Sequence, residues 1–486
     1  MAPEIVFAAA PVKADALAVG LRPDLKTAQS WIAQALAGKH RFKGEEGDVL
    51  PILTPDGWFV AVGLDAEDDQ DACSLRRVGS ALFAELCDGG IEHLCLDMGL
   101  DMGLSPQDSA ELAYGIALRA WRPSDKYRSK LDPDEAWSLS KITIVTSDVK
   151  AAQTYFARLD AVATGLRYAR DLVVAPGNEL TPQGFVTRLE ELFPLGIQVE
   201  VLDAKALRKQ GLNLLLAVGQ GSTNPPLLAV LRWNGGKKNA APLAFVGKGI
   251  TFDTGGISIK DGEDMEEMKG DMGGAATVAG LMMALALRKA PVNAVGVLAI
   301  AENMPSGTAT RPGDVVTGYN GTTVEIVDTD AEGRLALADA LAWTAKQCEP
   351  SLMVDLATLT GAVEVALGKK RAGLFTASDK LAKRLMQAGE DEDELLWRLP
   401  LVDFYDEGIK SAAADLRNCS WDDLCPDHLQ AARFLQHFVP KSLAWAHLDI
   451  AGLSEAGDDE DGDEPLTGPG PTGFGIRLLD RLADKG

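Results

Sequence analysis

Cysteine and histidine are scarce in this chain, whose 486 residues include six cysteines and five histidines. No two cysteines have the C-x-x-C spacing of zinc ribbons or thioredoxin-like redox motifs, which argues against both classes. The helical zinc-protease pattern H-E-x-x-H is also absent. We therefore expect the cysteines to be reduced thiols of a cytoplasmic protein, some of them packed as small apolar residues.

Basic residues are outnumbered, with 47 Lys and Arg against 71 Asp and Glu, which gives a net charge of −24. A basic phosphate-binding surface is therefore not expected, and nucleic acid is not predicted as a partner. No apolar run reaches the roughly 18 residues of a membrane span, and the N-terminus lacks the basic region of a signal peptide. These absences predict a cytoplasmic protein with no membrane partner.

The length and the rhythm of the sequence predict two α/β domains. A chain of 486 residues is too long for one hydrophobic core. Residues 1–150 mix strand-like and helical segments and predict a smaller N-terminal α/β domain, which a helix over 151–172 connects to the remainder. From 173 to 486, near-continuous apolar runs alternate with glycine-rich turns and helices. That pattern is typical of a central mixed, mostly parallel sheet buried on both faces, with its chemistry in loops beyond the strand ends.

An unusual row of charges precedes an apolar helical segment at residues 327–341, VDTDAEGRLALADAL. On an extended chain, Asp328, Asp330, Glu332 and Arg334 would share one face. Two unscreened carboxylates about 5 Å apart repel by roughly 3 kcal/mol at an effective dielectric near 20. Solvation and the dipole of a helix N-terminus could offset this repulsion, or a divalent cation could. The row alone leaves both interpretations open.

A second stretch, residues 245–274, places Lys248, Asp253, Lys260 and Asp271 among glycines after an apolar strand. Each has an ordinary explanation: an Asx turn for Asp253, an N-cap for Asp271, and surface exposure for the lysines. The stretch is not a P-loop, and the chain has no G-x-S-x-G nucleophile elbow. A metal site here would consist of carboxylates and a lysine, as in two-metal hydrolases.

Four blocks in order, VGKGITFDTGGISIK, MKGDMGGAA, DTDAEGRLALADAL and DLATLTGA, resemble the cytosolic leucyl aminopeptidase family. RDLVVAPGNELTP, IKSAAADLRN and AWAHLDIAG extend the resemblance over most of the C-terminal part of the chain. The resemblance implies a metal-dependent aminopeptidase that removes N-terminal, preferentially leucine-like residues from peptides with a free N-terminus. It also implies a homohexamer.

The resemblance assigns two divalent metal ions, zinc, manganese or magnesium, to a set of five ligands: Lys248, Asp253, Asp271, Asp330 and Glu332. In this assignment Asp253 and Glu332 bridge the ions, and Lys248 binds as a neutral amine. A metal-bridging hydroxide would attack the scissile carbonyl. Lys260 would stabilise the oxyanion, and Arg334 would hold a bicarbonate ion that acts as general base. The implied side-chain pocket draws on Met268, Thr358, Leu359, Gly361 and Ala451.

The sequence departs from the family pattern at three places. Asp328 stands where the family usually has Asn, and residues 421–436, WDDLCPDHLQAARFLQ, replace a stretch of small residues. An acidic run is inserted at 455–464. A phosphatase is a weaker alternative, because no basic phosphate clamp accompanies the carboxylates. A catalytically silent or regulatory assembly protein on the same fold is the alternative from another class, although no position of the site is broken.

Overall fold

The chain folds into two α/β units, each with its own sheet, in a computed structural model. Residues 2–484 are described except for 24–41, 56, 65, 67–70, 98–102, 124–127, 129, 131–135, 421–425 and 457–465. One unit comprises Met1–Ala163 and Ala456–Gly470, and the other comprises Thr164–Glu455 and Pro471–Gly486. The first five residues of the 421–436 departure, and nearly all of the acidic run, lie outside the described residues.

The first unit is built on a mostly parallel six-stranded sheet. Helices α2 (Ala72–Leu86) and α3 (Pro106–Arg119) pack closely, because Gly79 and Gly115 leave no side chain between the two backbones. A buried ion pair joins them, with Arg76 Nε 2.7 Å from Glu111 Oε2. The strand order is β1 (Glu4–Ala8), β6 (Lys141–Val145), β5 (His93–Asp97), β2 (Ala16–Leu21), β4 (Gly57–Gly63) and β3 (Val49–Thr54). The long helix α4 spans Val149–Val173.

The second unit is built on an eight-stranded mixed sheet. Its order is β15 (Leu396–Arg398), β14 (Ala372–Phe375), β17 (Trp445–Asp449), β13 (Leu352–Ala357), β9 (Leu243–Asp253), β10 (Asn293–Asn303), β8 (Leu227–Asn234) and β7 (Gln198–Leu202). The four neighbouring strands β17, β13, β9 and β10 are mutually parallel. Their carboxyl ends therefore meet at one edge, which is where ligands bind in sheets of this kind.

Strand β9 shows why the sheet is buried on both faces. Its side chains alternate: Val246 and Lys248 point toward α9 (Gly333–Cys348), while Gly247 and Gly249 lie against α8 (Gly273–Leu287). A side chain at Gly247 would meet the α8 backbone at 2.6 Å, so only glycine permits this close packing. The same alternation sends the Lys248 side chain to the start of α9, beneath the carboxyl edge.

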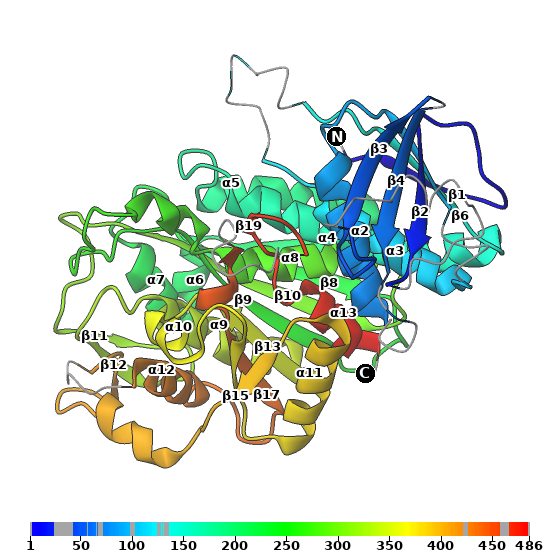
Figure 1. The fold of residues 1–486 in the computed structure, drawn as a ribbon. Coiled ribbons are helices and arrows are strands. Elements are labelled where there is room, and N and C mark those ends of the chain that lie inside the picture. Colours follow the sequence, from blue (N-terminus) through cyan, green and yellow to red (C-terminus); the bar gives the residue numbers. More distant parts are fainter. Residues whose placement is uncertain are drawn as a thin grey trace. The chain divides into compact units, whose positions relative to one another are not determined.

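Helices cover both faces of this sheet (Figure 1). The remaining helical segments of the described chain are α5 (Pro182–Leu189), η4 (Glu190–Leu195), α6 (Ala204–Gln210), α7 (Asn213–Gly219), η5 (Met265–Gly270), α10 (Gly361–Leu367), α11 (Asp379–Glu392), η6 (Asp403–Ile409), α12 (Asp427–Gln436), η7 (Ala451–Leu453) and α13 (Ile476–Asp484). Met265–Leu287 is long and apolar enough to cross a membrane by length and composition alone. Its apolar window is 89% buried inside the fold, as suits a core helix covering the sheet.

A small sheet leads the chain into the site. It contains β11 (Asp314–Thr317), β12 (Thr323–Ile326) and β16 (Leu416–Arg417), with β12 in the middle. Val324 and Ile326 of β12 are buried in the core. The strand ends at Ile326, and the chain then turns before α9 begins at Gly333. Of two very short strands, β18 (Glu455–Ala456) begins the acidic run and β19 (Gly470–Pro471) follows it.

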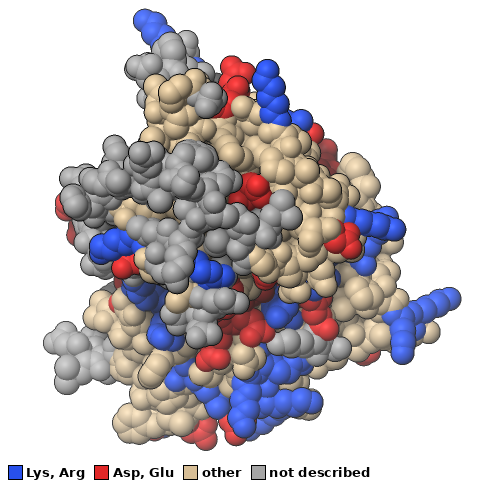
Figure 2. Space-filling view, turned by 45° about the vertical axis from the view of Figure 1, so that its right-hand side comes forward, with Lys and Arg blue, Asp and Glu red and all other residues tan. Residues whose placement is uncertain are grey.

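The described surface carries charges of both signs. Figure 2 shows Asp and Glu side chains interspersed with Lys and Arg on one face.

Candidate metal centre

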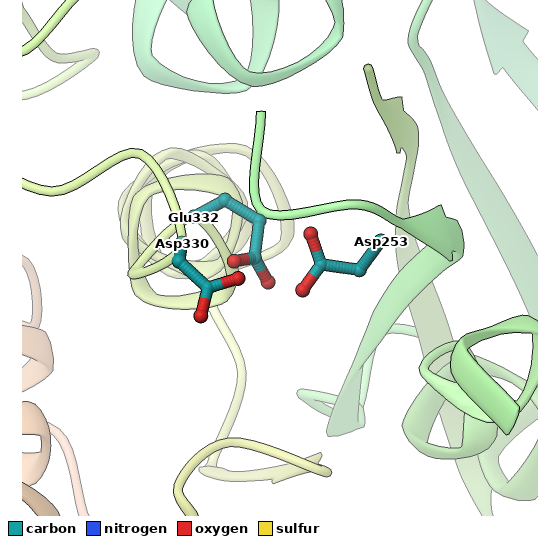
Figure 3. A group of neighbouring side chains, drawn as sticks. All are labelled: Asp253, Asp330 and Glu332. Atoms are coloured by element: carbon teal, nitrogen blue, oxygen red, sulfur yellow. The ribbon is translucent and has the colours of Figure 1, made fainter. Parts of the chain in front are cut away.

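Three carboxylates converge at the carboxyl edge of the second unit's sheet. Asp253 is the last residue of β9, while Asp330 and Glu332 lie in the turn that precedes α9. Each offers an oxygen, and these oxygens all lie within 4.8 Å of one another. The side chains point toward one another from the two segments (Figure 3). Asp253 and Glu332 are both only 2% exposed, so these charges meet in a largely dry setting.

Two lysines divide the acidic side chains into two pairs. Lys248 Nζ lies 2.7 Å from Asp271 Oδ1 and 3.0 Å from Glu332 Oε1. Lys260 Nζ lies 2.9 Å from Asp253 Oδ2 and 2.5 Å from Asp330 Oδ1. The structure thus brings all five predicted ligands, and Lys260, into one connected group. Asp271 joins it through Lys248.

Burial and mutual repulsion set the protonation of the group. Burial raises the pKa of Glu332 to about 8, and the charge of Asp253 acts in the same direction. Burial likewise raises the pKa of Asp271 and of Asp330 to about 6. Burial would lower the pKa of Lys248, but the charges of Asp271 and Glu332 outweigh it and raise that pKa. Without metal the site therefore retains protons, and a cation bound through the Lys248 amine would release one.

The donor set fits divalent cations. Carboxylate oxygens are the ligands that hard divalent ions prefer, and Zn²⁺ and Mn²⁺ also accept an amine nitrogen. Asp271 Oδ2 and Glu332 Oε2 are buried and have no hydrogen-bond partner among the described residues. A buried carboxylate oxygen without a partner is costly, and a metal ion would satisfy it.

The surrounding residues hold these carboxylates in place. Asn303, at the end of β10, donates its amide to Asp253 Oδ1 at 2.8 Å and to the Thr329 carbonyl at 3.0 Å. The Thr329 hydroxyl donates to the Gly255 carbonyl at 2.7 Å, so the two acidic segments are tied together. Gly333 follows Glu332 because a side chain there would lie 2.6 Å from the Lys248 stem. Sequence reasoning missed Asn303, although a polar residue at a parallel strand end is a usable signal.

Asp328 has a different place from the one predicted. The segment after Ile326 is a turn rather than an extended row, because Asp328 Oδ1 accepts the backbone N–H of Asp330 at 2.9 Å. The Asn418 side chain accepts from Val327 N–H at 2.9 Å and donates to the Asp328 carbonyl at 2.6 Å. The expectation that four charged side chains share one extended face is therefore wrong, although Asp330 and Glu332 do meet.

Arg334 lies on the first turn of α9 and is 3% exposed. Its Nη1 donates to the Asn418 carbonyl at 2.9 Å. Its Nη2 lies 2.8 Å from each carboxylate oxygen of Asp427, the first residue of α12. Sequence reasoning missed Asp427, although it lies in the 421–436 stretch already recognised as a departure from the family.

The predicted pocket residues lie around the same strand ends. The Thr358 hydroxyl donates to Asp271 Oδ1 at 2.7 Å, and its carbonyl accepts from Lys248 Nζ at 2.8 Å. Asp449 Oδ1 accepts the backbone N–H groups of Leu359 at 3.2 Å and of Ala451 at 3.3 Å, which joins the loops after β13 and β17. Gly361 opens α10, and Met268 lies half-buried in η5.

Buried carboxylates and amines at the carboxyl edge of an α/β sheet are the kind of site that metal-dependent hydrolases use. Comparison with known proteins specifies the class further, because residues 167–480 match the cytosol aminopeptidase family, catalytic domain. The chain belongs to this family, whose members use two metal ions, and it is a metallo-aminopeptidase that acts on peptides.

Relatives match along most of the chain. A probable cytosol aminopeptidase of Rhodopseudomonas palustris (strain BisA53) is 46% identical, over 95% of this chain and 92% of the relative. One from Nitrobacter winogradskyi is 45% identical, over 93% and 90%. Among solved structures, a mutant of tomato leucine aminopeptidase has a TM-score of 0.86 at 30% identity, covering 100% of this chain and 97% of that one. The bottromycin maturation enzyme BotP in complex with Mn has a TM-score of 0.84 at 34% identity, covering 97% and 99%.

Proposed function

We propose that this enzyme releases N-terminal, preferentially leucine-like residues from peptides, using two divalent ions held by Lys248, Asp253, Asp271, Asp330 and Glu332. The observation that carries the assignment is the division of the site between two lysines. Each ammonium group lies within a separate pair of carboxylates, so the site already offers two adjacent positions for positive charge. In this assignment Asp253 and Glu332 contribute to both positions.

The remaining residues supply binding and charge stabilisation. Divalent ions held by these residues would lower the pKa of a bound water, the proposed nucleophile, and would polarise the scissile carbonyl. Lys260 stabilises the negative charge that develops on the carbonyl oxygen, a contribution typically of several kcal/mol. Arg334 holds the anionic general base beside the reaction, which the family resemblance predicts to be bicarbonate.

The preference for leucine-like residues rests on the loops around the strand ends. Met268, Thr358, Leu359, Gly361 and Ala451 are proposed to line the side-chain pocket. One methylene group changes discrimination between substrates by only ~1–3 kcal/mol, so the pocket should rank apolar residues gradually rather than select one.

We further propose a homohexamer in the cytoplasm. Light scattering that returns the mass of one or two chains would refute the hexamer.

A leucyl anilide assay tests the proposal directly. Activity should require added Mn²⁺, Zn²⁺ or Mg²⁺, should disappear with chelator and should be lost in Asp330→Asn. An N-acetylated dipeptide should resist cleavage while the free dipeptide is cut, because the free amine is expected to bind a metal. Cleavage of both peptides at similar rates would contradict an exopeptidase site.

The same assay addresses the alternative of a catalytically silent assembly protein. That alternative predicts no turnover with any of the three metals. The intact group of carboxylates and lysines favours the enzyme, because a silent relative has no need to keep buried carboxylates that repel one another.

A further inference from the structure

The guanidinium of Arg334 needs an anion from its surroundings. The side chain is buried, and a buried charge is costly unless it is paired. Among the described residues, Asp427 is its acidic partner, while its other contact is the neutral Asn418 carbonyl. Arg334 Nη2 lies 2.8 Å from each of the two carboxylate oxygens of Asp427, whereas the buried Nε of Arg334 has no hydrogen-bond partner among the described residues.

The helix that carries Asp427 is anchored in the core of the second unit. It begins α12, whose Phe434 and Leu435 are buried in the same core as residues of α9. Arg433 on the same helix pairs with Asp406, with Nη2 2.6 Å from Oδ2, and fixes the outer side of α12. The Asp427 side chain is 33% exposed, so solvent reaches this carboxylate although the arginine beneath it is buried.

A carboxylate and a bicarbonate ion present the same planar pair of oxygens to a guanidinium. With Asp427 at Nη2, a bicarbonate bound through Nε would lie beside a second negative charge in a poorly solvated place. The Asp427 carboxylate and bicarbonate therefore compete for the Arg334 guanidinium. The acid arises from the 421–436 stretch, where this chain departs from the family pattern.

We infer that Asp427 supplies the anionic base at Arg334 in this enzyme, so that catalysis does not depend on added bicarbonate. This inference rests on the proposed function. The Asp427 carboxylate accepts a proton from the attacking water as the oxygen–carbon bond forms. It returns that proton to the leaving amine nitrogen as the carbon–nitrogen bond breaks, so no other reactant is needed.

The test compares the metal-loaded full chain in CO₂-free buffer with the same buffer containing bicarbonate, with chloride matching the ionic strength. The kcat/KM of the wild type should change less than about twofold, because its base is built in. The kcat/KM of Asp427→Ala should be ~100-fold below that of the wild type without bicarbonate, and bicarbonate should raise it at least ~10-fold. Asp406→Asn is the matched control, since it removes the Asp406–Arg433 pair of α12 and should behave as wild type.

A second readout does not involve turnover. Bicarbonate should raise the Tm of Asp427→Ala, because an anion that binds only the folded state stabilises it, and should leave the wild-type Tm unchanged. If Asp427→Ala does not fold, Asp427→Asn and the wild-type bicarbonate titration decide the question. Bicarbonate activation of the wild type, or full activity of the variant without bicarbonate, overturns the inference. A wild type inactive with every metal refutes the proposed function instead, and the Tm comparison still tests the anion at Arg334.

Discussion

Replacing Glu332 with Gln should change the free energy of unfolding in opposite directions in the metal-free and the metal-loaded protein. Glu332 is buried, with oxygens of Asp253 and Asp330 within 4.8 Å and the Lys248 ammonium at 3.0 Å. Gln keeps the shape of the side chain and removes its charge. The variant therefore isolates the electrostatic part of this residue's contribution.

The distances give the magnitude. At an effective dielectric near 20, repulsion from each neighbouring carboxylate is at least about 3.5 kcal/mol, and attraction to Lys248 is about 5.5 kcal/mol. Repulsion therefore exceeds attraction even before the cost of burying the charge. Burial also raises the pKa of Glu332 to about 8, as expected for a carboxylate held in an unfavourable place. In the chelated protein above pH 8, where Glu332 carries its charge, Glu332→Gln should cost no stability and should add about 1 kcal/mol or more.

With metal present the wild type should be more stable than the variant, because the carboxylate whose charge is unfavourable without metal becomes a ligand to the cations. Denaturant unfolding of both proteins, with chelator and with saturating Mn²⁺, measures the four free energies. The wild type should gain several-fold more stability from Mn²⁺ than the variant. A chelated variant that is several kcal/mol less stable than the chelated wild type would refute the reasoning, because Glu332 would then be a structural residue.

Three further predictions concern other parts of the second unit. Asp328→Asn should retain substantial activity with a shifted metal requirement, because an amide oxygen can still accept the Asp330 N–H; loss of all activity would count against this. In the chelated protein, the pKa of about 8 at Glu332, against roughly 4.3 when unfolded, makes stability fall as pH rises between these values. The Mn²⁺-induced rise in Tm, measured by calorimetry, should therefore be larger at pH 8 than at pH 6, and the reverse order would contradict it. Asp339→Asn should destabilise the protein by about 3 kcal/mol in denaturant titration. The two oxygens of the buried carboxylate accept three backbone N–H groups, whereas the NH2 group of an amide cannot accept any of them. A loss of stability below ~1 kcal/mol would contradict this.

The sheet was predictable because its signals are local. Strand β9 is a continuous apolar run, and the two glycines around Lys248 indicate a close approach by a helix. The run ends at Asp253, which places an acid at the edge where parallel strands deliver their ligands. Such features depend on neighbours in the sequence, so the class of fold follows from them directly.

Contacts between distant segments were harder to predict. Asp427 meets Arg334 across 93 residues of sequence, and no local pattern indicates which acid pairs with which arginine. Asp328 was misread because alternation on an extended chain and an Asx turn allow the same residue types. The burial of the apolar segment ending at Leu287 likewise follows from the tertiary fold and not from its composition.

Direct location of bound metal tests the central claim most simply. Crystals grown with Mn²⁺ should show two anomalous peaks about 3.5–4 Å apart among Asp253, Asp271, Asp330 and Glu332, with Lys248 at one of them. A fully active enzyme whose crystals show no metal between these side chains would contradict the account.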